Sequence, residues 1–373
     1  MKSTFSNVYQ AGKVKRDAVV IVTSDSGEIG NGFFINKSFN IICPASLVYR
    51  SKSVTVSVSN VNGARKSFTY IAGIEGADYF GNLCMLRILT CDENKVNPPL
   101  DPLHHPFLKF GRSKEVFENN GLVLIGNFVK GSREISNTII FPCLIVDKVY
   151  ASSNCCIPTE LMMLNGVSPK YLHGCAVLNR SGDIIGMQIQ SKEPLVSVIT
   201  EYAMRRPIKS FKDPIAYSKH VEIIDNVMIY KKSMLGISAE IASQFDVHKS
   251  RASKSDASVS VDVLELPKLP NEIIGYLVKD VLLTSPLHGI LEQGDIITHI
   301  NNIALGMRQH QTSIGCVLWS IYPGKKTTIT YTRGTSICKI DDVVTMECTS
   351  EYDIPFTMSR DIMLGQHCRK YYV

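Results

Sequence analysis

The hydrophobic positions of the first 200 residues fall in many short runs, and Gly, Asn, Ser and Pro separate these runs at short intervals. Runs of this kind predict β-strands, and their spacing is typical of an all-β sandwich or a pair of barrels. Helical periodicity first appears between Ala203 and Phe211, where we expect a short helix. The predicted strands are Val19 to Thr23, Gly32 to Ile35, Ile41 to Ile42, Val54 to Ser59, Leu83 to Ile88, Leu122 to Ile125, Ile139 to Val146, Cys175 to Leu178 and Ile184 to Gln190.

The pattern changes after this region. A polar, Ser- and Lys-rich stretch near residues 248–262 predicts a flexible insertion or an exposed loop. Strands are then expected at Tyr276 to Leu283, Ile296 to Ile300 and Thr327 to Thr332, with a short helix after Pro286 and a longer one near Thr312 to Ile321. This order predicts a small α+β module at the end of the chain.

Composition limits the class of protein. The chain has 373 residues, of which 45% are hydrophobic and 20% charged, so it can form two or three domains with their own cores. The net charge of +6 is spread along the chain and does not form a basic block. We find no motif for nucleic-acid binding and no Gly-rich phosphate loop, so a specific nucleic-acid partner is not expected.

The sequence predicts a soluble, intracellular protein. Residues Met1 to Asn7 contain no apolar segment typical of a signal peptide, and no apolar run approaches the ~20 residues of a membrane span. The 11 cysteines are scattered, mostly in apolar runs, and none forms a C-x-x-C pair. This pattern indicates core thiols in a reducing compartment, without a metal site or a cofactor.

Five segments along the chain match the motifs of one protein family in the same order and with similar spacing. Gly30-Asn31-Gly32-Phe33-Phe34-Ile35 is similar to G-S-G-F-I-I, for example, and Gly121 to Asn127 ends as A-I-G-N does. The others are Ile41 to Val48, Asp78 to Ile88, and Tyr171 to Asn179 with Gly182 to Met187. Together they resemble the HtrA-type trypsin-like serine proteases. The resemblance implies a mostly β fold, with a chymotrypsin-like double six-stranded β-barrel over residues 1–232.

The C-terminal module continues this resemblance. The segments Leu235 to Ile237, Gly275 to Ile297, Ile300 to Asn302 and Tyr322 to Gly334 are similar to the PDZ domain that follows the protease in the family. The resemblance implies an α+β PDZ-like domain over residues 233–345, interrupted by the Ser- and Lys-rich insertion. Residues 346–373 would form a C-terminal tail.

The departures from the family fall on its catalytic positions. Ser46 stands where the family has its general-base His, Asn82 where it has the orienting Asp, and His173 where it has the nucleophilic Ser. The oxyanion-loop positions are Tyr171, Leu172 and Gly174. Tyr171 replaces a Gly, and a Tyr is poorly suited to a backbone with φ > 0.

These departures predict that the chain is not an enzyme. A serine nucleophile needs an adjacent imidazole as base and a carboxylate that orients it. The first 103 residues contain no His, and His104 and His105 lie in the segment expected between the barrels. We therefore expect a catalytically inactive protease homologue with a binding, scaffolding or structural role, for instance within a large assembly such as a virus particle.

Three other arrangements stay open. Ser46 could attack with His173 as its base, although the oxyanion loop lies beside position 173. Cys175 could be a nucleophile if the register slips by two residues. His173 could bind a metal together with Cys175 or Cys43, although a zinc site needs three or four ligands. The first two arrangements would make the chain an active protease.

The PDZ-like module predicts partners. A PDZ domain binds a peptide by adding it to an exposed sheet edge, while loop N–H groups bind the terminal carboxylate. By resemblance, Ile274, Gly275, Tyr276 and Leu277 form the loop, and Leu277 to Val281, which includes Val278, form the edge. The helix near Thr312 to Trp319 would be the other wall. The expected partners are protein C-termini, including this chain's own Tyr371-Tyr372-Val373, and further copies or members of a larger complex.

Overall fold

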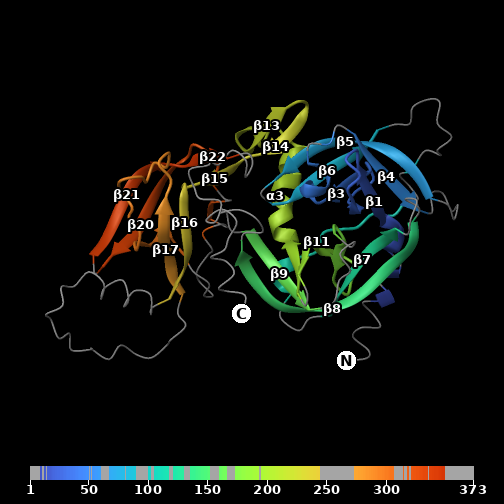
Figure 1. Cartoon of the computed structure of the whole chain (residues 1–373), viewed down its shortest axis with the longest axis horizontal. Coiled ribbons are helices and arrows are strands. Elements are labelled where there is room, and N and C mark those ends of the chain that lie inside the picture. The colour runs from blue at the N-terminus through green and yellow to red at the C-terminus, as the bar shows by residue number, and fades with distance from the viewer. Residues whose placement is uncertain are drawn as a thin grey trace. The chain divides into compact units, whose positions relative to one another are not determined.

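The computed structural model divides the chain into two compact units. Unit 1 comprises Met1–Val149 and Glu160–Tyr230, and unit 2 comprises Tyr150–Thr159 and Lys231–Val373 (Figure 1). The structure describes residues 9–348 except for a few isolated positions and the segments 60–66, 90–99, 102–104, 117–120, 130–134, 152–158, 166–172, 193–194, 244–272, 306–313, 315–316 and 319–320. The predicted insertion near 248–262 and the tail after Cys348 therefore lie outside the described residues.

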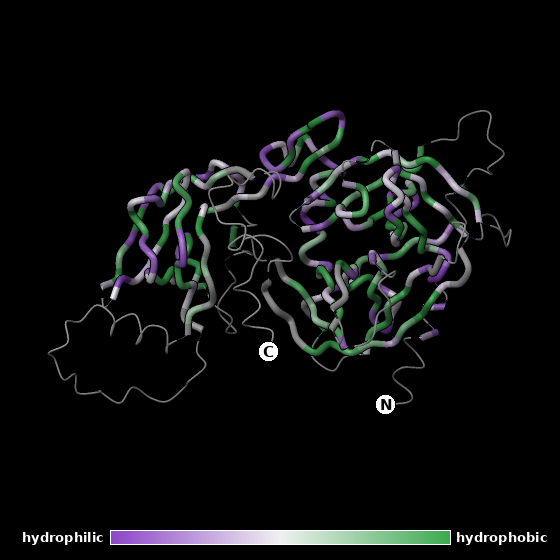
Figure 2. The backbone as a smooth tube through the Cα atoms, viewed as in Figure 1, coloured by the Kyte–Doolittle hydropathy of each residue, from purple (hydrophilic) through white to green (hydrophobic). Residues whose placement is uncertain are grey.

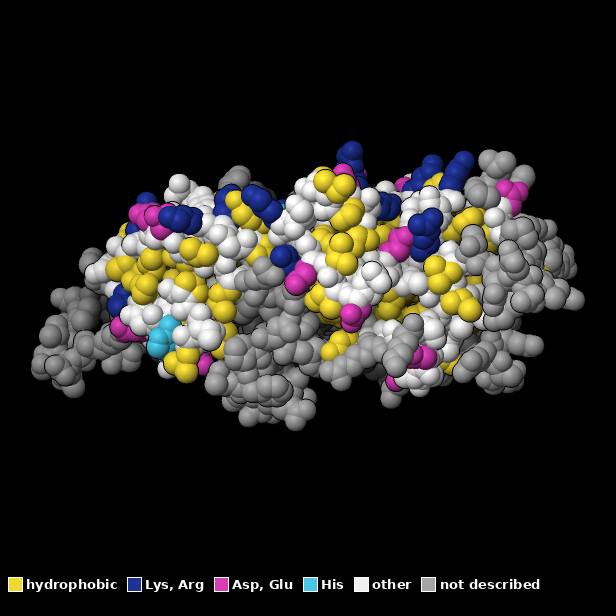
Figure 3. Space-filling view, turned by 90° about the horizontal axis from the view of Figure 1, so that it is seen from above, with side chains coloured by type: hydrophobic (Ala, Val, Ile, Leu, Met, Phe, Trp, Pro, Cys, Tyr) yellow, Lys and Arg dark blue, Asp and Glu magenta, His cyan; other side chains and the backbone are white. Residues whose placement is uncertain are grey.

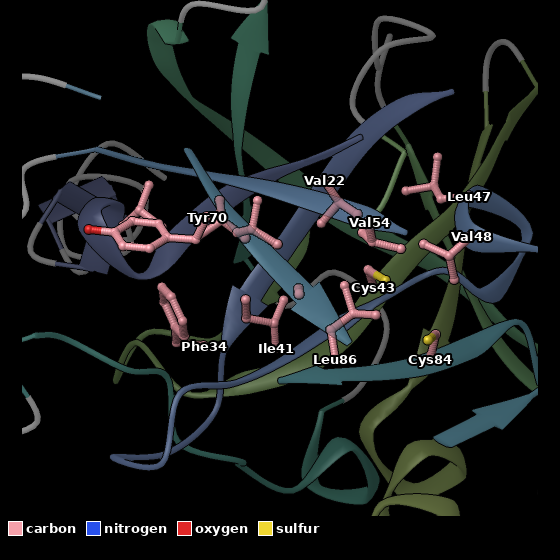
Figure 4. Packing of buried hydrophobic residues seen from close by; sticks show 14 of the residues in the cluster. Val22, Phe34, Ile41, Cys43, Leu47, Val48, Val54, Tyr70, Cys84 and Leu86 are labelled. Atoms are coloured by element: carbon pink, nitrogen blue, oxygen red, sulfur yellow. The ribbon is translucent and has the colours of Figure 1, made fainter. Parts of the chain in front are cut away.

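Six strands of unit 1 close into a first barrel in the order β5-β4-β1-β2-β3-β6, because β6 also pairs with β5. β-branched residues favour strands, and the Val19-Val20-Ile21-Val22 run of β1 is buried along its whole length. Phe34, Ile41 and Leu86 belong to the core that fills the barrel (Figure 4). The strands are β1 (Val19–Ser24), β2 (Ile29–Phe34), β3 (Asn40–Cys43), β4 (Val54–Ser59), β5 (Ser67–Asp78) and β6 (Leu83–Ile88).

Six further strands form a second closed barrel in the order β10-β11-β12-β9-β8-β7. Leu124, Val177 and Val198 belong to its core, and green hydrophobic segments run through both barrels in Figure 2. The expected chymotrypsin-like pair of six-stranded barrels is thus confirmed. The strands are β7 (Gly121–Val129), β8 (Ile135–Ala151), β9 (Thr159–Asn165), β10 (Ala176–Leu178), β11 (Ile184–Lys192) and β12 (Leu195–Thr200).

A helix and a hairpin complete unit 1. The helix α3 (Glu201–Lys212) begins at Thr200, whose hydroxyl accepts a hydrogen bond from the N–H of Ala203. The hairpin follows α3 and joins the first barrel, because β14 pairs in parallel with β5. The remaining elements are the 3₁₀ helices η1 (Arg16–Ala18), η3 (Ser113–Glu115) and η5 (Ser218–His220), the helix α2 (Ala45–Val48), and the strands β13 (Val221–Ile224) and β14 (Val227–Tyr230).

Unit 2 contains a sheet in the order β16-β17-β18-β20-β21, with β19 paired to β18. The helical residues Ile314, Val317 and Leu318 are spaced to lie on one face, and all three pack into the core of this sheet. A separate pair joins β15 to β22, so Met346–Cys348 belongs to unit 2. The strands are β15 (Lys232–Met234), β16 (Ile237–Ser243), β17 (Ile273–Val281), β18 (Ile296–Ile300), β19 (Ile303–Ala304), β20 (Lys326–Arg333), β21 (Ser336–Val344) and β22 (Met346–Cys348).

The surface carries charges of both signs. On the face seen in Figure 3, Lys and Arg side chains are scattered among Asp and Glu side chains and hydrophobic groups. In the part of the chain that the structure describes, no helix is long and apolar enough to cross a membrane.

Candidate functional site

Ser46 and Asn82 are directly connected in the first barrel. Ser46 lies on α2, immediately after β3, and its side chain is exposed. Asn82 precedes β6, and its Oδ1 accepts a 2.8 Å hydrogen bond from the backbone N–H of Ser46. Asn82 has φ of 49°, a left-handed conformation that Asn tolerates better than most residues. The amide side chain therefore fixes α2 against the beginning of β6.

His173 lies in the turn before β10, in the second barrel. Burial lowers the pKa of its imidazole, and a hydrogen bond to the backbone of Ile189 acts in the opposite direction. Nε2 is buried and has no hydrogen-bond partner among the described residues. The bond to Ile189 is therefore assigned to Nδ1, which leaves a neutral ring with the Nε2 lone pair unused.

The backbone around His173 is fixed by its neighbours. The carbonyl of His173 accepts a 2.7 Å hydrogen bond from the N–H of Asn31, and the N–H of Gly174 donates to the carbonyl of Gln188 at 2.9 Å. Gly174 has φ of 88°, and a Cβ at this position would collide with the carbonyl oxygen of Asn31. Only glycine fits this turn without displacing β2.

Asn31 also joins the two barrels. Its Oδ1 accepts a 2.6 Å hydrogen bond from the backbone N–H of Asn127 on β7. The side chain of Asn127 donates to the carbonyl of Val19 at 2.9 Å and accepts from the hydroxyl of Thr138 at 2.8 Å. These polar groups are buried and bonded to one another, so they hold β2 and β7 in register beside His173. The sequence did not predict this role of Asn31, although the residue stands at a departure from the G-S-G motif.

The segments that carry Ser46, Asn82 and His173 lie close together in unit 1. Asn82 contacts Ser46 directly, and a Cβ placed on Gly30 would meet both the side chain of Leu47 and the carbonyl of His173. A Cβ on Gly174 would likewise approach Pro44. The segment that carries Ser46 therefore lies beside the turn that carries His173. Because Nε2 of His173 has no partner among the described residues, Ser46 and His173 are not hydrogen-bonded to each other.

The other candidate residues occupy different environments. Cys175 is fully buried in the core of the second barrel, and burial raises the pKa of its thiol well above the usual value, which disfavours the nucleophilic thiolate. His105 packs edge-on against Phe34 in the first barrel, and burial lowers its pKa to about 4. In the described part of the chain, no three His, Cys, Asp or Glu side chains are grouped as metal ligands would be. Tyr171, Leu172 and His104 lie outside the described residues.

The strand predicted as the peptide-binding edge of unit 2 has a neighbouring strand on each side. The strand that contains Gly275, Tyr276, Leu277 and Val278 is β17, which pairs with β16 on one side and β18 on the other. Tyr276 and Val278 are buried in the core of the sheet. Leu277 pairs with a residue on each side, and the stretch from Leu277 to Val281 is covered by β16. Ile274 lies in the same strand.

Among the described strands, the outer strand on this side of the sheet is β16. Hydrogen bonds inside unit 2 hold the turn that precedes β16. The carbonyl of Leu235 accepts a 2.6 Å hydrogen bond from Ser285 Oγ. The carbonyl of Gly236 accepts a 2.8 Å hydrogen bond from the N–H of Leu282. Gly236 has φ of 66°, which favours glycine. The Leu235-Gly236-Ile237 motif was the sequence signal that could have located this edge.

Comparison with known proteins agrees with this fold. No family model and no curated protein matches the chain. Among solved structures, the HtrA-type protease AlgW with a tripeptide is 15% identical with a TM-score of 0.63, over 91% of this chain and 97% of that one. AlgW with a decapeptide is 13% identical with a TM-score of 0.59, over 91% and 98%. The serine endoprotease from Yersinia pestis is 14% identical with a TM-score of 0.56, over 91% and 98%.

The fold is that of the HtrA-type proteases. This finding corrects the expectation that the chain is not an enzyme, because the similar solved structures are proteases. At 13–15% identity the likeness shows the fold alone. The chemistry of this chain therefore depends on its own side chains at positions 46, 82 and 173, which are Ser, Asn and His.

Proposed function

We propose that the protein binds extended polypeptide segments at the edge of β16. The observation that carries this proposal is the strand order, in which β16 is an outer strand among the described residues. An outer strand presents a row of backbone N–H and C=O groups, and an extended peptide can pair with them as an additional strand. The proposed binding edge is one strand away from the strand that the sequence predicts.

The turn before β16 supports the proposal. The carbonyls of Leu235 and Gly236 are both bonded inward, to Ser285 and Leu282, so the turn has one defined shape at the start of the edge. A preorganised turn lowers the entropy cost of binding a peptide terminus. The AlgW structures that share this fold are described with a tripeptide and with a decapeptide, which supports a polypeptide as the class of ligand.

A titration with peptides tests the proposal. Fluorescent peptides with apolar C-termini should bind the full chain, and amidation of their terminal carboxylate should weaken binding about tenfold if the turn holds the carboxylate. The chain's own Lys370-Tyr371-Tyr372-Val373 is one such sequence. A chain without these four residues should bind the same peptides at least as tightly. Equal and negligible binding of both peptide forms to both chains would contradict the proposal.

Peptide hydrolysis is a second candidate function, and one observation favours it. The His173 ring has a lowered pKa and an unused Nε2, which are properties of a general base. In this candidate, His173 would accept the proton of the Ser46 hydroxyl. Turnover of casein or of a fluorogenic peptide that disappears in both Ser46→Ala and His173→Ala would support it. Turnover that survives both substitutions would contradict it.

A further inference from the structure

Two free cysteines face each other in the first barrel. Cys43 is the last residue of β3 and Cys84 is the second residue of β6, and the two are direct partners in the antiparallel register. Both side chains are fully buried and belong to the same core cluster, so they point into the barrel (Figure 4). Neither residue is part of the peptide-binding edge proposed in unit 2.

The register suits a covalent bond between them. Directly opposite residues of an antiparallel pair have Cβ atoms about 4.5–5.5 Å apart, and a disulfide needs about 3.5–4.5 Å. The two thiols are close enough that Cys43 contributes to the raised pKa of Cys84. A small approach of β3 and β6 would therefore bring the sulfur atoms into bonding range without a change of register.

The pair is close along the chain to the hydrogen bond between Ser46 and Asn82. Cys43 is followed by Pro44, Ala45 and Ser46, whereas Asn82 lies two residues before Cys84. The hydrogen bond from Ser46 N–H to Asn82 Oδ1 joins the same two strand ends. A disulfide between Cys43 and Cys84 would therefore link covalently the same two strand ends that this hydrogen bond joins.

We propose that Cys43 and Cys84 are a disulfide-forming site, which a peroxide oxidises and a small-molecule thiol reduces. The thiolate of one cysteine attacks a peroxide oxygen, which breaks the O–O bond and gives a sulfenic acid and the first water. The other thiol then attacks that sulfur and releases the second water. Overall, two thiols lose two electrons and two protons, and one hydrogen peroxide is reduced to two waters.

The surroundings of the pair set the rate of this reaction. Burial raises the pKa of the Cys84 thiol well above its usual value, and the contact with Cys43 adds to this effect. The Cys84 thiolate is therefore scarce while β3 and β6 remain paired. The disulfide should form through local opening of these strands, so that low urea concentrations accelerate its formation.

Peptide mapping by mass spectrometry of the peroxide-treated full chain tests the proposal. The expected product is a cross-link between the peptides of Cys43 and Cys84, which forms faster in low urea and disappears with dithiothreitol. Cys143 is the matched control, because it is also buried but lies opposite Leu122. It should remain available for alkylation after unfolding. Cys43 and Cys84 that are still thiols when the half-exposed Cys338 is fully oxidised would overturn the proposal.

A second measurement tests the link to the site. Hydrogen exchange of the Ser46 amide should slow about tenfold or more in the cross-linked protein, because the disulfide restrains the two strand ends that its hydrogen bond to Asn82 joins. The exchange of amides in β10, in the other barrel, should not change. An unchanged exchange rate at Ser46 in fully cross-linked protein would contradict the role of the disulfide at this site.

Discussion

The amide oxygen of Asn82 accepts a 2.8 Å hydrogen bond from the backbone N–H of Ser46, which joins α2 to the residue that precedes β6. The hydrogen bond uses the main chain of Ser46, which leaves its hydroxyl exposed. The contact therefore has a structural role in joining α2 to β6, whatever the side chain at position 46 does.

Replacement of Asn82 should lower stability through this contact. Asn82→Ala removes the acceptor and places Ala at a φ of 49°, so the free energy of unfolding should fall by about 2–3 kcal/mol. Urea denaturation measures the change. Asn82→Asp keeps an acceptor and should cost less than about 1 kcal/mol, and Ser46→Ala keeps the N–H and should be nearly neutral. Equal losses in all three variants would show that the bond does not stabilise the fold.

Substitution of Gly174 should be far more disruptive than substitution of Gly27. Both have positive φ, of 88° and 89°, so Ala adds a similar backbone cost of about 1 kcal/mol at each position. A Cβ on Gly27 meets nothing within 4 Å, whereas one on Gly174 collides with the carbonyl of Asn31. Gly174→Ala should therefore lower the melting temperature by several degrees more than Gly27→Ala. Similar melting temperatures would contradict this account of the turn.

Two partly buried histidines, His105 and His173, should make the protein sensitive to acid. Burial lowers the pKa of His173, and it lowers that of His105 to about 4, so the unfolded chain binds more protons than the folded one below pH 6.5. Stability should be fully present above pH 6.5 and should decline as the pH falls towards 4. His105→Phe keeps an aromatic ring and removes the titration, so its loss of stability over this interval should be smaller. A variant with the same acid dependence as the parent chain would contradict the prediction.

The turn before β16 should influence peptide binding. Ser285→Ala removes the hydroxyl that bonds the Leu235 carbonyl, so the peptide dissociation constant should rise about 3- to 10-fold. Thr345→Val is the control, because it removes another buried hydroxyl of unit 2, one that bonds the carbonyls of Tyr322 and Lys325. It should leave the dissociation constant unchanged. Isothermal titration calorimetry distinguishes the two, and an equal effect of both variants would argue against a specific role of the turn.

The sequence predicts the barrels well because their signals are local. Val19 to Thr23 and Ile184 to Gln190 are apolar runs between turn residues, and both are strands within a residue or two of the predicted limits. Positions 46, 82 and 173 come from motif spacing, and the barrels bring them together. The contact between Asn31 and Asn127 connects residues 96 positions apart, and no local pattern indicates it.

The errors arise where the pairing of distant strands decides the structure. β17 has the expected sequence of a strand, but its neighbour β16 lies on the other side of residues 244–272, so the sequence does not show which of the two is the outer strand. The short helix expected after Pro286 is a series of turns, in which Gly289 and Gly294 adopt φ of 75° and 97°. The turn between β13 and β14 consists of Asp225 and Asn226, both with positive φ, which is a two-residue pattern typical of a β-hairpin.

Hydrogen exchange of the full chain with and without a bound peptide tests the proposed peptide binding most directly. β16 and β21 are the two outer strands of the described sheet, so each serves as the reference for the other. The account predicts that peptide protects amides between Ile237 and Ser243 and leaves those between Ser336 and Val344 unchanged. Protection of β21 alone, or of neither strand at saturating peptide, would contradict it.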